Sequence, residues 1–306
     1  MVRLVLALAA FVTTACTMTA CTGTTKTPDS PEAGDSNPDT DTGPIPDTDS
    51  DTDTGPDIEA EPGFVVVRAS TFAMGCTDGQ SDCDADETEH SVTLTHDYVV
   101  SETEVTQAKF EAILGYNPSI FIDCGADCPV ENVSWHMSAA YANAMSDAAG
   151  LSPCYACVGT GSDVQCESSE AVYACDGYRL LTEAEWEGAA RCGTDLLYAG
   201  SDNINEVGWV GGNSGDLTHA VAGLAPNACG IYDMSGNVWE WTQDWYAAYE
   251  AGSATDPTGP ASGTGRSVRG GGWDGGAPRA RVSGRTEFYP DGANYYFGFR
   301  LGRTIP

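Results

Sequence analysis

The sequence predicts a single α+β domain with little regular secondary structure over residues 64–306. Helix-capping residues open three segments, whereas the β-branched segments are short and interrupted by glycine, of which the chain has 36. Residues 1–21 are typical of a lipoprotein signal peptide and residues 22–63 of a disordered linker. A folded part of about 240 residues is long enough to bury one sizeable core.

Capping chemistry defines the helices, because a Ser or Thr hydroxyl satisfies the first free backbone N–H groups and glycine adopts the left-handed stop. The predicted helices are residues 106–114, ended by Gly115; residues 134–149, capped by Ser134 and ended by Gly150; and a third that opens with the capping box of Thr182 and Glu185 and ends at Gly193.

The extended segments are rich in β-branched residues or alternate in polarity, as strands do. We expect strands at residues 64–72 and 91–100, and shorter extended segments at 267–272, 281–285 and 297–301.

The first residues predict export and a lipid anchor. Arg3 precedes nine apolar residues, a run too short to span a bilayer as a helix. Cys16 and Cys21 each follow small residues, in patterns that resemble the lipobox of bacterial lipoproteins. Lipidation of Cys21 leaves an even number of cysteines in the mature chain, so we favour Cys21 over Cys16. The expected location is the bacterial cell envelope, lipid-anchored at the outer membrane or cell surface; an ordinary cleaved signal is the alternative.

Charge and composition restrict the partners. The linker consists largely of Asp, Thr, Pro and Gly and cannot bury enough surface to fold. The whole chain carries a net charge of −32, which repels nucleic acid and anionic lipid. We therefore expect no nucleic-acid partner, and contact with the membrane only through the lipid.

Ten cysteines remain after Cys21, and an exported chain favours disulfides. Local spacing predicts Cys76–Cys83 and Cys124–Cys128, and Cys192–Cys229 as a longer bridge. The pairing within the cluster of four stays open, and zinc is the alternative there because Cys-x-x-Cys is a zinc half-site. That cluster is Cys154, Cys157, Cys166 and Cys175.

Residues 227–245 combine aromatic and acidic side chains more densely than any other stretch. Trp239 and Trp241 would share one face of a strand, and the acids between and around them could place oxygen atoms around a hard cation. The alternative is a tryptophan-rich core strand with solvated acids.

Six sequence blocks follow one another along the folded part. They are Thr71-Phe-Ala-Met-Gly75, Glu102-Thr-Glu-Val-Thr-Gln107, Pro129-Val-Glu-Asn-Val-Ser-Trp135, Tyr178-Arg-Leu-Leu-Thr-Glu-Ala-Glu-Trp-Glu187, residues 227–245, and Arg269-Gly-Gly-Gly-Trp273 with Gly298-Phe-Arg300. In this order they resemble the blocks of the formylglycine-generating enzyme family, also called the sulfatase-modifying factor family. The resemblance implies one domain of the C-type-lectin-like kind.

The resemblance implies catalysis only where the family's two copper-binding cysteines are present. In the family both thiolates follow the glycine block and precede an Arg-x-x-x-Arg pair, here Arg281 and Arg285. No cysteine follows Cys229 in this chain, and Gly272 replaces the usual Ser. Copper(I) prefers soft thiolate ligands, so we expect no copper. The positions that should carry the thiolates lie among Asp274, Gly275, Gly276, Ala277 and Ala280.

The family's calcium site is better preserved. By resemblance its ligands are the side chains of Asp233 and Glu240 and the backbone carbonyls of Gly236 and Val238. We therefore expect bound calcium.

Two functions follow. The first is a non-catalytic, calcium-stabilised surface module that binds a protein or glycan through a cleft containing Trp273, Arg281 and Arg285. The alternative is an active oxidase of the formylglycine-generating type. For Arg281 and Arg285, structural ion pairs with buried acids are an equally weighted alternative.

Overall fold

The computed structural model describes residues 60–77, 80–168 and 171–305. The predicted signal peptide, the lipidation candidates Cys16 and Cys21, and the predicted linker up to residue 59 lie outside the described residues. Among the described residues, none of the helices combines the length and apolar character that a membrane span requires.

The three predicted helices are confirmed, and their caps are formed as expected. The Thr106 and Ser134 hydroxyls accept hydrogen bonds from the N–H groups three residues on, and Thr182 and Glu185 complete a capping box. The third helix ends at Cys192, in the left-handed region with φ 45°, one residue before the expected Gly193. The helices are α1 (Gln107–Leu114), α2 (Trp135–Ala149), α3 (Glu183–Arg191) and the short α4 (Ile204–Val207).

Two predicted strands are each divided in two. Asp97 binds the backbone N–H of Ala69 and the side chain of Arg68, which turns the chain between β1 (Phe64–Val67) and β2 (Ser70–Met74). Residues 91–100 become β3 (His90–Leu94) and β4 (Tyr98–Ser101). Residues 281–284 are irregular, and the strand there begins only at Arg285. Side chains distant in sequence set these breaks, so local pattern does not reveal them.

The strands form four small sheets. The first has the order β1-β4-β13-β7, with β13 at Leu301–Thr304 and β7 at Arg179–Leu180. The second has the order β11-β10-β8-β12, formed by Arg285–Phe288, Arg266–Arg269, Trp239–Trp245 and Phe297–Gly298. The third is β2-β3-β9, with β9 at Ser253–Thr255, and the last pairs β5 (Tyr155–Val158) with β6 (Gln165–Ser168).

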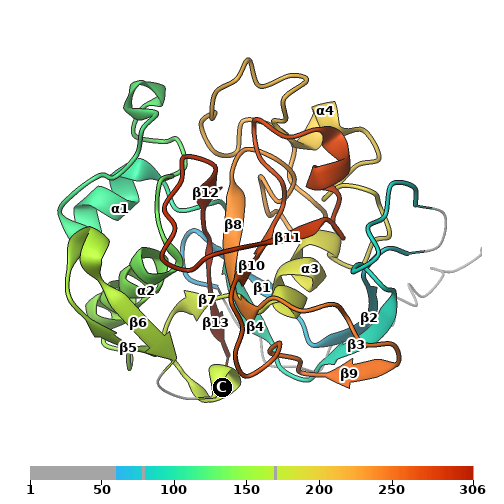
Figure 1. Cartoon of the computed structure of the whole chain (residues 1–306), viewed down its shortest axis with the longest axis horizontal. Helices are drawn as coiled ribbons and strands as arrows, with labels where there is room; N and C mark the ends of the chain where they lie inside the picture. The colour runs from blue at the N-terminus through green and yellow to red at the C-terminus, as the bar shows by residue number, and fades with distance from the viewer. Residues whose placement is uncertain (1–59, 78–79, 169–170, 306) are drawn as a thin grey trace, which may run out of the picture. The chain divides into compact units, whose positions relative to one another are not determined.

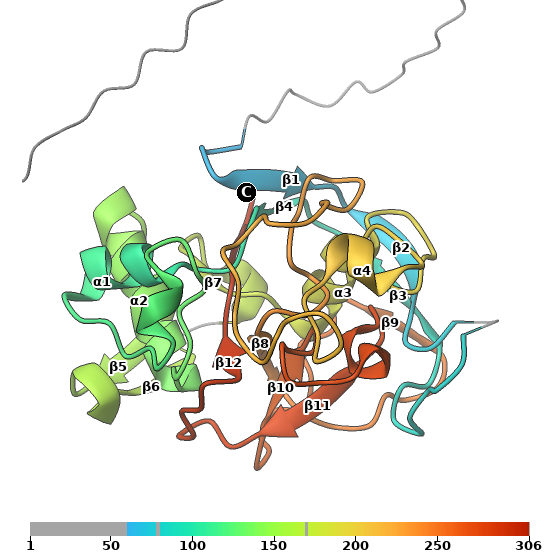
Figure 2. The same ribbon diagram turned by 90° about the horizontal axis from the view of Figure 1, so that it is seen from above.

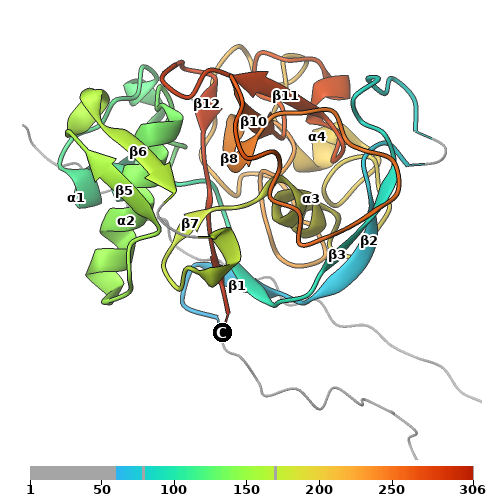
Figure 3. The same ribbon diagram turned by 60° about the horizontal axis from the view of Figure 1, so that its bottom comes forward.

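Strand β8 occupies the middle of the described fold (Figure 1). It pairs antiparallel with β10 and parallel with β12, so strands from three distant parts of the chain meet there. Helices α1 and α2 lie on one side of this sheet and α3 and α4 on the other, as seen from above in Figure 2. Strands β2, β3 and β9 form an outer layer beside α3 (Figure 3).

All ten described cysteines are paired in five disulfides. The predicted Cys76–Cys83, Cys124–Cys128 and Cys192–Cys229 are confirmed. The open cluster resolves into Cys154–Cys175 and Cys157–Cys166, the second of which joins β5 to β6. The four cysteines of this cluster therefore form disulfides in place of the alternative zinc site.

The folded part begins slightly before residue 64. Glu61, assigned to the linker by composition, lies 2.8 Å from Arg303 of β13 and also accepts a hydrogen bond from Tyr178. One acidic residue in a linker-like composition gives no sign of such a distant partner.

Candidate functional site

Strand β8 is buried on both faces. Trp241 packs its ring against Phe297 and Phe288, with centroids 5.2 and 6.2 Å apart. Glu240 and Asp244 are also buried, at 1% and 4% exposure. The tryptophan-rich strand is a core strand, as one alternative held, but its acids are not solvated. Buried carboxylates require partners, and those partners define the site.

Glu240 is held by an arginine and a tryptophan. Arg300 approaches it as a fork, with Nε 2.7 Å from Oε2 and Nη2 2.7 Å from Oε1. The indole Nε1 of Trp186, on α3, donates to the same Oε2 at 2.7 Å. Such bidentate charge-assisted pairs are among the stronger hydrogen bonds in proteins. Trp186 thus joins β8 to α3, and Arg300 joins β8 to the residues directly before β13.

Three buried carboxylates share this one arginine. Glu104 accepts from the backbone N–H of Val238 at 3.1 Å, and Asp233 from that of Ala222 at 2.7 Å. Burial, reinforced by Asp233 and Glu240, raises the pKa of Glu104 well above its ordinary value. Burial likewise raises the pKa of Asp233 to about 6. Both acids therefore keep their protons to a higher pH than exposed carboxyl groups do, and the negative charge of the cluster grows as the pH rises.

The charge of this cluster fits a cation such as calcium, and its geometry determines how the cation would be held. Glu240 has both carboxylate oxygens engaged by Arg300 and Trp186, whereas Asp233 binds only a backbone N–H among the described contacts. Of the two predicted side-chain ligands, Asp233 is therefore the more available. Oxygen ligands of mixed charge suit calcium.

Helix α3 presents three buried glutamates to arginines. Each forms an ion pair, with the N···O distance in parentheses: Glu183 with Arg285 (2.8 Å), Glu185 with Arg179 (2.6 Å) and Glu187 with Arg269 (2.5 Å). Burial opposes ionisation of Glu183 and Glu185, but the arginines outweigh it and lower both pKa values to about 2. The alternating glutamates of the Thr-Glu-Ala-Glu-Trp-Glu block therefore organise the interior.

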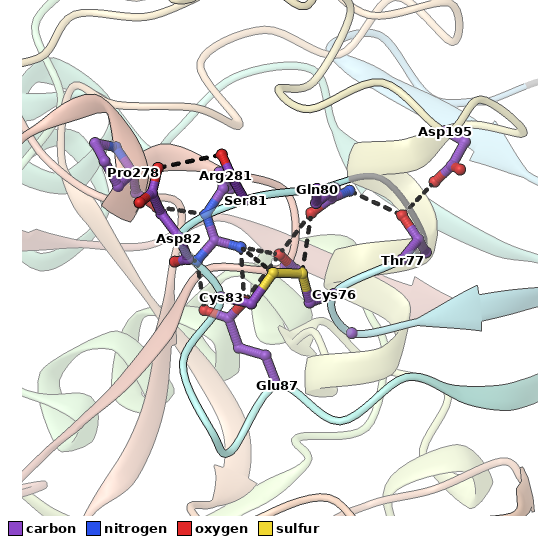
Figure 4. Close-up of a disulfide and its surroundings, with 12 residues drawn as sticks. Cys76, Thr77, Gln80, Ser81, Asp82, Cys83, Glu87, Asp195, Pro278 and Arg281 are labelled. Carbon is purple, nitrogen blue, oxygen red and sulfur yellow. Dashed lines mark hydrogen bonds and ion pairs between the residues drawn. A yellow bond between two sulfur atoms is a disulfide. The ribbon is translucent and has the colours of Figure 1, made fainter.

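Arg281 and Arg285, predicted to line a binding cleft, are instead committed to acids. Arg281 donates two hydrogen bonds to the Glu87 carboxylate, of 2.7 and 2.8 Å, beside the Cys76–Cys83 disulfide (Figure 4). Arg285 binds Glu183 and lies over the rings of Tyr246 and Tyr249, at 4.4 and 3.9 Å. Both are almost fully buried, and this geometry matches the alternative of structural ion pairs.

Trp273 lies apart from these arginines, in an aromatic cluster. Its ring is 5.2 Å from Phe121, 6.0 Å from Tyr295 and 5.6 Å from Tyr296. Beside Phe121 in the chain, Ile120 and Ile122 are 59% and 61% exposed, and Tyr295 is 37% exposed. Ile120, Ile122 and Tyr295 are the exposed part of an apolar surface, here called the aromatic face, which also contains the half-buried rings of Phe121 and Tyr296 and the buried ring of Trp273.

The positions expected to carry the family's thiolates lie next to the aromatic face. Gly275 and Gly276 contribute only backbone, and Ala277 begins a short 3-10 helix that ends at Ala280. Ala280 is fully buried, and a Cβ on Gly271 would lie 2.9 Å from its Cα. This close packing fills the place with backbone and methyl groups.

Sequence reasoning assigned no role to several residues that organise the site. Asn227 donates to the carbonyls of Ala189 and Ala190 at 2.7 and 3.1 Å and so caps the end of α3. Arg300 and Glu104 stand inside blocks that carried the resemblance, so block membership was a usable signal. Phe121 lies outside every block, and only its three-dimensional neighbours identify it.

The fold and site define a disulfide-bonded α+β domain whose tryptophan-rich strand and glutamate helix are held together by arginines. The chain matches the sulfatase-modifying factor enzyme 1-like domain over residues 50–305, and it belongs to that family.

Two relatives and one solved structure describe its place in the family. The chain is 33% identical over 242 residues to the chaperone protein LppX of Paenibacillus barcinonensis, covering 70% of this chain and 82% of that protein. It is 40% identical over 144 residues to the formylglycine-generating enzyme of Streptomyces coelicolor, covering 40% of this chain and 46% of the enzyme. Treponema denticola variable protein 1 is 34% identical with a TM-score of 0.70, covering 79% of this chain and 95% of that chain.

Proposed function

We propose that this chain is a non-catalytic binding module of its family, exported and lipid-anchored through Cys21 or Cys16. The observation that carries the proposal is the loss of the thiolate pair. Gly, Ala and Asp occupy the stretch where the family's two cysteines stand, and the ten described cysteines are all in disulfides. Neither a copper(I) site nor a nucleophilic thiol is then available within the described residues.

The aromatic face is the proposed binding surface. Exposed apolar patches on soluble domains mark interaction sites, and tyrosine and tryptophan supply rigid contact area. The exposed isoleucines on both sides of Phe121 favour a protein surface over a glycan, because they add apolar area without hydrogen-bonding groups. A relative that is named a chaperone protein supports the same choice. A glycan is the other outcome of the test.

The experiment is capture of envelope proteins by the immobilised full chain. Variants inside the aromatic face are compared with a variant outside it. We expect a partner that wild type retains and that Ile120→Ser combined with Ile122→Ser and Tyr295→Ala loses. Tyr289→Ala is the matched control, since Tyr289 is 71% exposed but outside the aromatic face. Equal capture by all variants would contradict the proposed surface. Binding that survives protease but not glycan oxidation would assign the face to a glycan.

The chain is expected not to convert cysteine to formylglycine. Copper(I) exchange with a substrate thiol requires soft ligands, and Asp274, the one side-chain donor near the missing pair, is a hard oxygen ligand. The measurement incubates the chain with copper(I), oxygen, reductant and a Cys-x-Pro-x-Arg peptide and follows the peptide mass. Aldehyde formation above the no-enzyme control, abolished by a copper chelator, would instead support the active-oxidase alternative.

Calcium is proposed to stabilise the loop that precedes β8. We expect added calcium to raise the melting temperature and a chelator to lower it, with Asp233→Asn removing the response. Glu240→Gln should lower the melting temperature in both conditions, because it also weakens the Arg300 pair. Asp147→Asn, at an exposed position, is the control. Identical melting of wild type in calcium and in chelator would refute the calcium proposal.

A further inference from the structure

A cavity of about 430 Å³ lies at the end of β8, far along the strand from the aromatic face. Its volume falls within the range of about 300–1,000 Å³ typical of small-molecule sites. Asp244 and Trp245 of β8, Glu183 of α3 and the loop of residues 257–260 contribute to its walls.

The buried glutamates of α3 and β8 are paired with cations in a regular pattern. On α3 and β8, four buried glutamates each have an arginine within 3 Å: Glu183, Glu185, Glu187 and Glu240. Burying a carboxylate without a cation or hydrogen bonds is costly, so this pairing is expected.

Asp244 departs from the pattern. It is 4% exposed, and its Oδ1 is buried with no hydrogen-bond partner. The nearby Arg266 forms no hydrogen bond with Asp244. Its guanidinium lies between the rings of Trp135 and Trp245, at 4.0 and 3.7 Å, and donates to the carbonyl of Gln243. Among the described residues, Asp244 is thus a cavity-lining carboxylate with an acceptor oxygen left over.

We propose that the cavity binds a primary alkylammonium group, which donates a hydrogen bond to Oδ1 of Asp244 while its alkyl chain lies along the apolar wall. The ammonium supplies the cation that the buried glutamates of α3 and β8 obtain from arginine. A free amine and a lysine side chain of a peptide share this chemistry.

The geometry favours an ammonium over other ligands. A single free acceptor oxygen suits one N–H donor of an ammonium, whereas a guanidinium binds best when both oxygens of a carboxylate are free. On the lining, Arg285 is paired with Glu183, and Glu250 adds a further carboxylate, which disfavours anions. The walls include small alanine side chains that leave room for an alkyl chain, at Ala184, Ala247, Ala248, Ala251 and Ala254.

The loop of residues 257–260 packs closely on the Asp244 side chain, whose Oδ1 is buried. Gly259 lies so close that an added Cβ would be 2.9 Å from the Asp244 Cβ. Ligand entry therefore requires a small displacement of residues 257–260. Burial, with Glu183 and Glu185 nearby, also raises the pKa of Asp244 well above its ordinary value, in keeping with a carboxylate that lacks a cation.

The test is an NMR titration of the full chain with n-butylammonium, with n-butanol as the uncharged probe of similar shape. We expect shifts of the Trp245 indole and the 247–251 amides with butylammonium, and at least tenfold weaker binding of butanol. Asp244→Asn should weaken butylammonium binding at least tenfold, whereas Asp147→Asn, at an exposed position outside the cavity lining, should change it less than threefold. Nα-acetyl-lysine amide, compared with a lysine-containing peptide, distinguishes a free amine from a protein side chain.

Two further results keep the proposal falsifiable. Asp244→Asn must melt as a folded domain; if it does not, Ala251→Trp provides a second test, because it narrows the cavity at an exposed position without altering the core. Equal binding of butylammonium and butanol, undiminished binding by either folded variant, or no binding by wild type would each overturn the proposal. These results do not depend on the aromatic face, so the two sites can fail separately.

Discussion

Replacing Arg300 with alanine is expected to lower the free energy of unfolding by about 3–5 kcal/mol, the range measured when one partner of a buried ion pair is removed. Arg300 is 1% exposed and forms both of its charged contacts with Glu240. Glu104 and Asp233 also depend on it, since the same arginine favours their ionised forms. Its loss leaves three buried carboxylates without a neighbouring arginine.

The measurement is urea unfolding of wild type and Arg300→Ala at neutral pH. Arg303→Ala, three residues further along the chain, is the matched control, because its pair with Glu61 is partly exposed. Partly exposed pairs contribute about 0–1 kcal/mol, so the two variants should differ clearly. An equal effect of both replacements would mean that the buried cluster does not depend on Arg300.

The cost of Arg300→Ala should decrease as the pH falls toward 4. Glu104 and Asp233 have raised pKa values in the folded state, so the folded chain holds more protons than the unfolded chain above their ordinary values. The free energy of unfolding therefore falls as the pH rises between the ordinary and the folded-state pKa values of these two acids. Removing Arg300 raises the folded-state pKa values further, so the fall continues to a higher pH. At pH 4 both acids are largely protonated when folded, and the missing arginine matters less.

Local chemistry explains what the sequence could predict. The helix starts at Thr106, Ser134 and Thr182 depend on a hydroxyl and an N–H three residues away, so a short window contains the whole interaction. The same holds for Cys76–Cys83 and Cys124–Cys128, which close short loops.

Long-range partners explain what it could not. Arg281 and Arg285 read as cleft residues because nothing near them in sequence pairs with them, yet their acids lie 194 and 102 positions away. The aromatic face joins Phe121 to Trp273 and Tyr295, which no local pattern connects. The resemblance predicted Glu240 as a calcium ligand. Its ion pair with Arg300 is visible only in the folded chain, where residues 240 and 300 lie side by side.

Removing the Cys192–Cys229 disulfide is expected to destabilise the chain by about 4 kcal/mol, and removing Cys124–Cys128 by only about 2 kcal/mol. The difference follows from loop length, because the two bridges close separations of 37 and 4 residues. A longer closed loop removes more conformations from the unfolded chain, so its loss costs more. The comparison uses paired Cys→Ala double variants and urea unfolding under non-reducing conditions.

Comparing the two disulfide variants separates the effect on the unfolded chain from the effect of lost native contacts. In the native chain Asn227 still holds the end of α3 by its bonds to Ala189 and Ala190, so loss of Cys192–Cys229 need not release the loop. The folded structures of both variants should therefore stay close to wild type, and stability alone should separate them. If both double variants lose the same free energy, the chain-entropy account is wrong here. The bridge at the end of α3 would then act mainly through native contacts, with Asn227 unable to replace it.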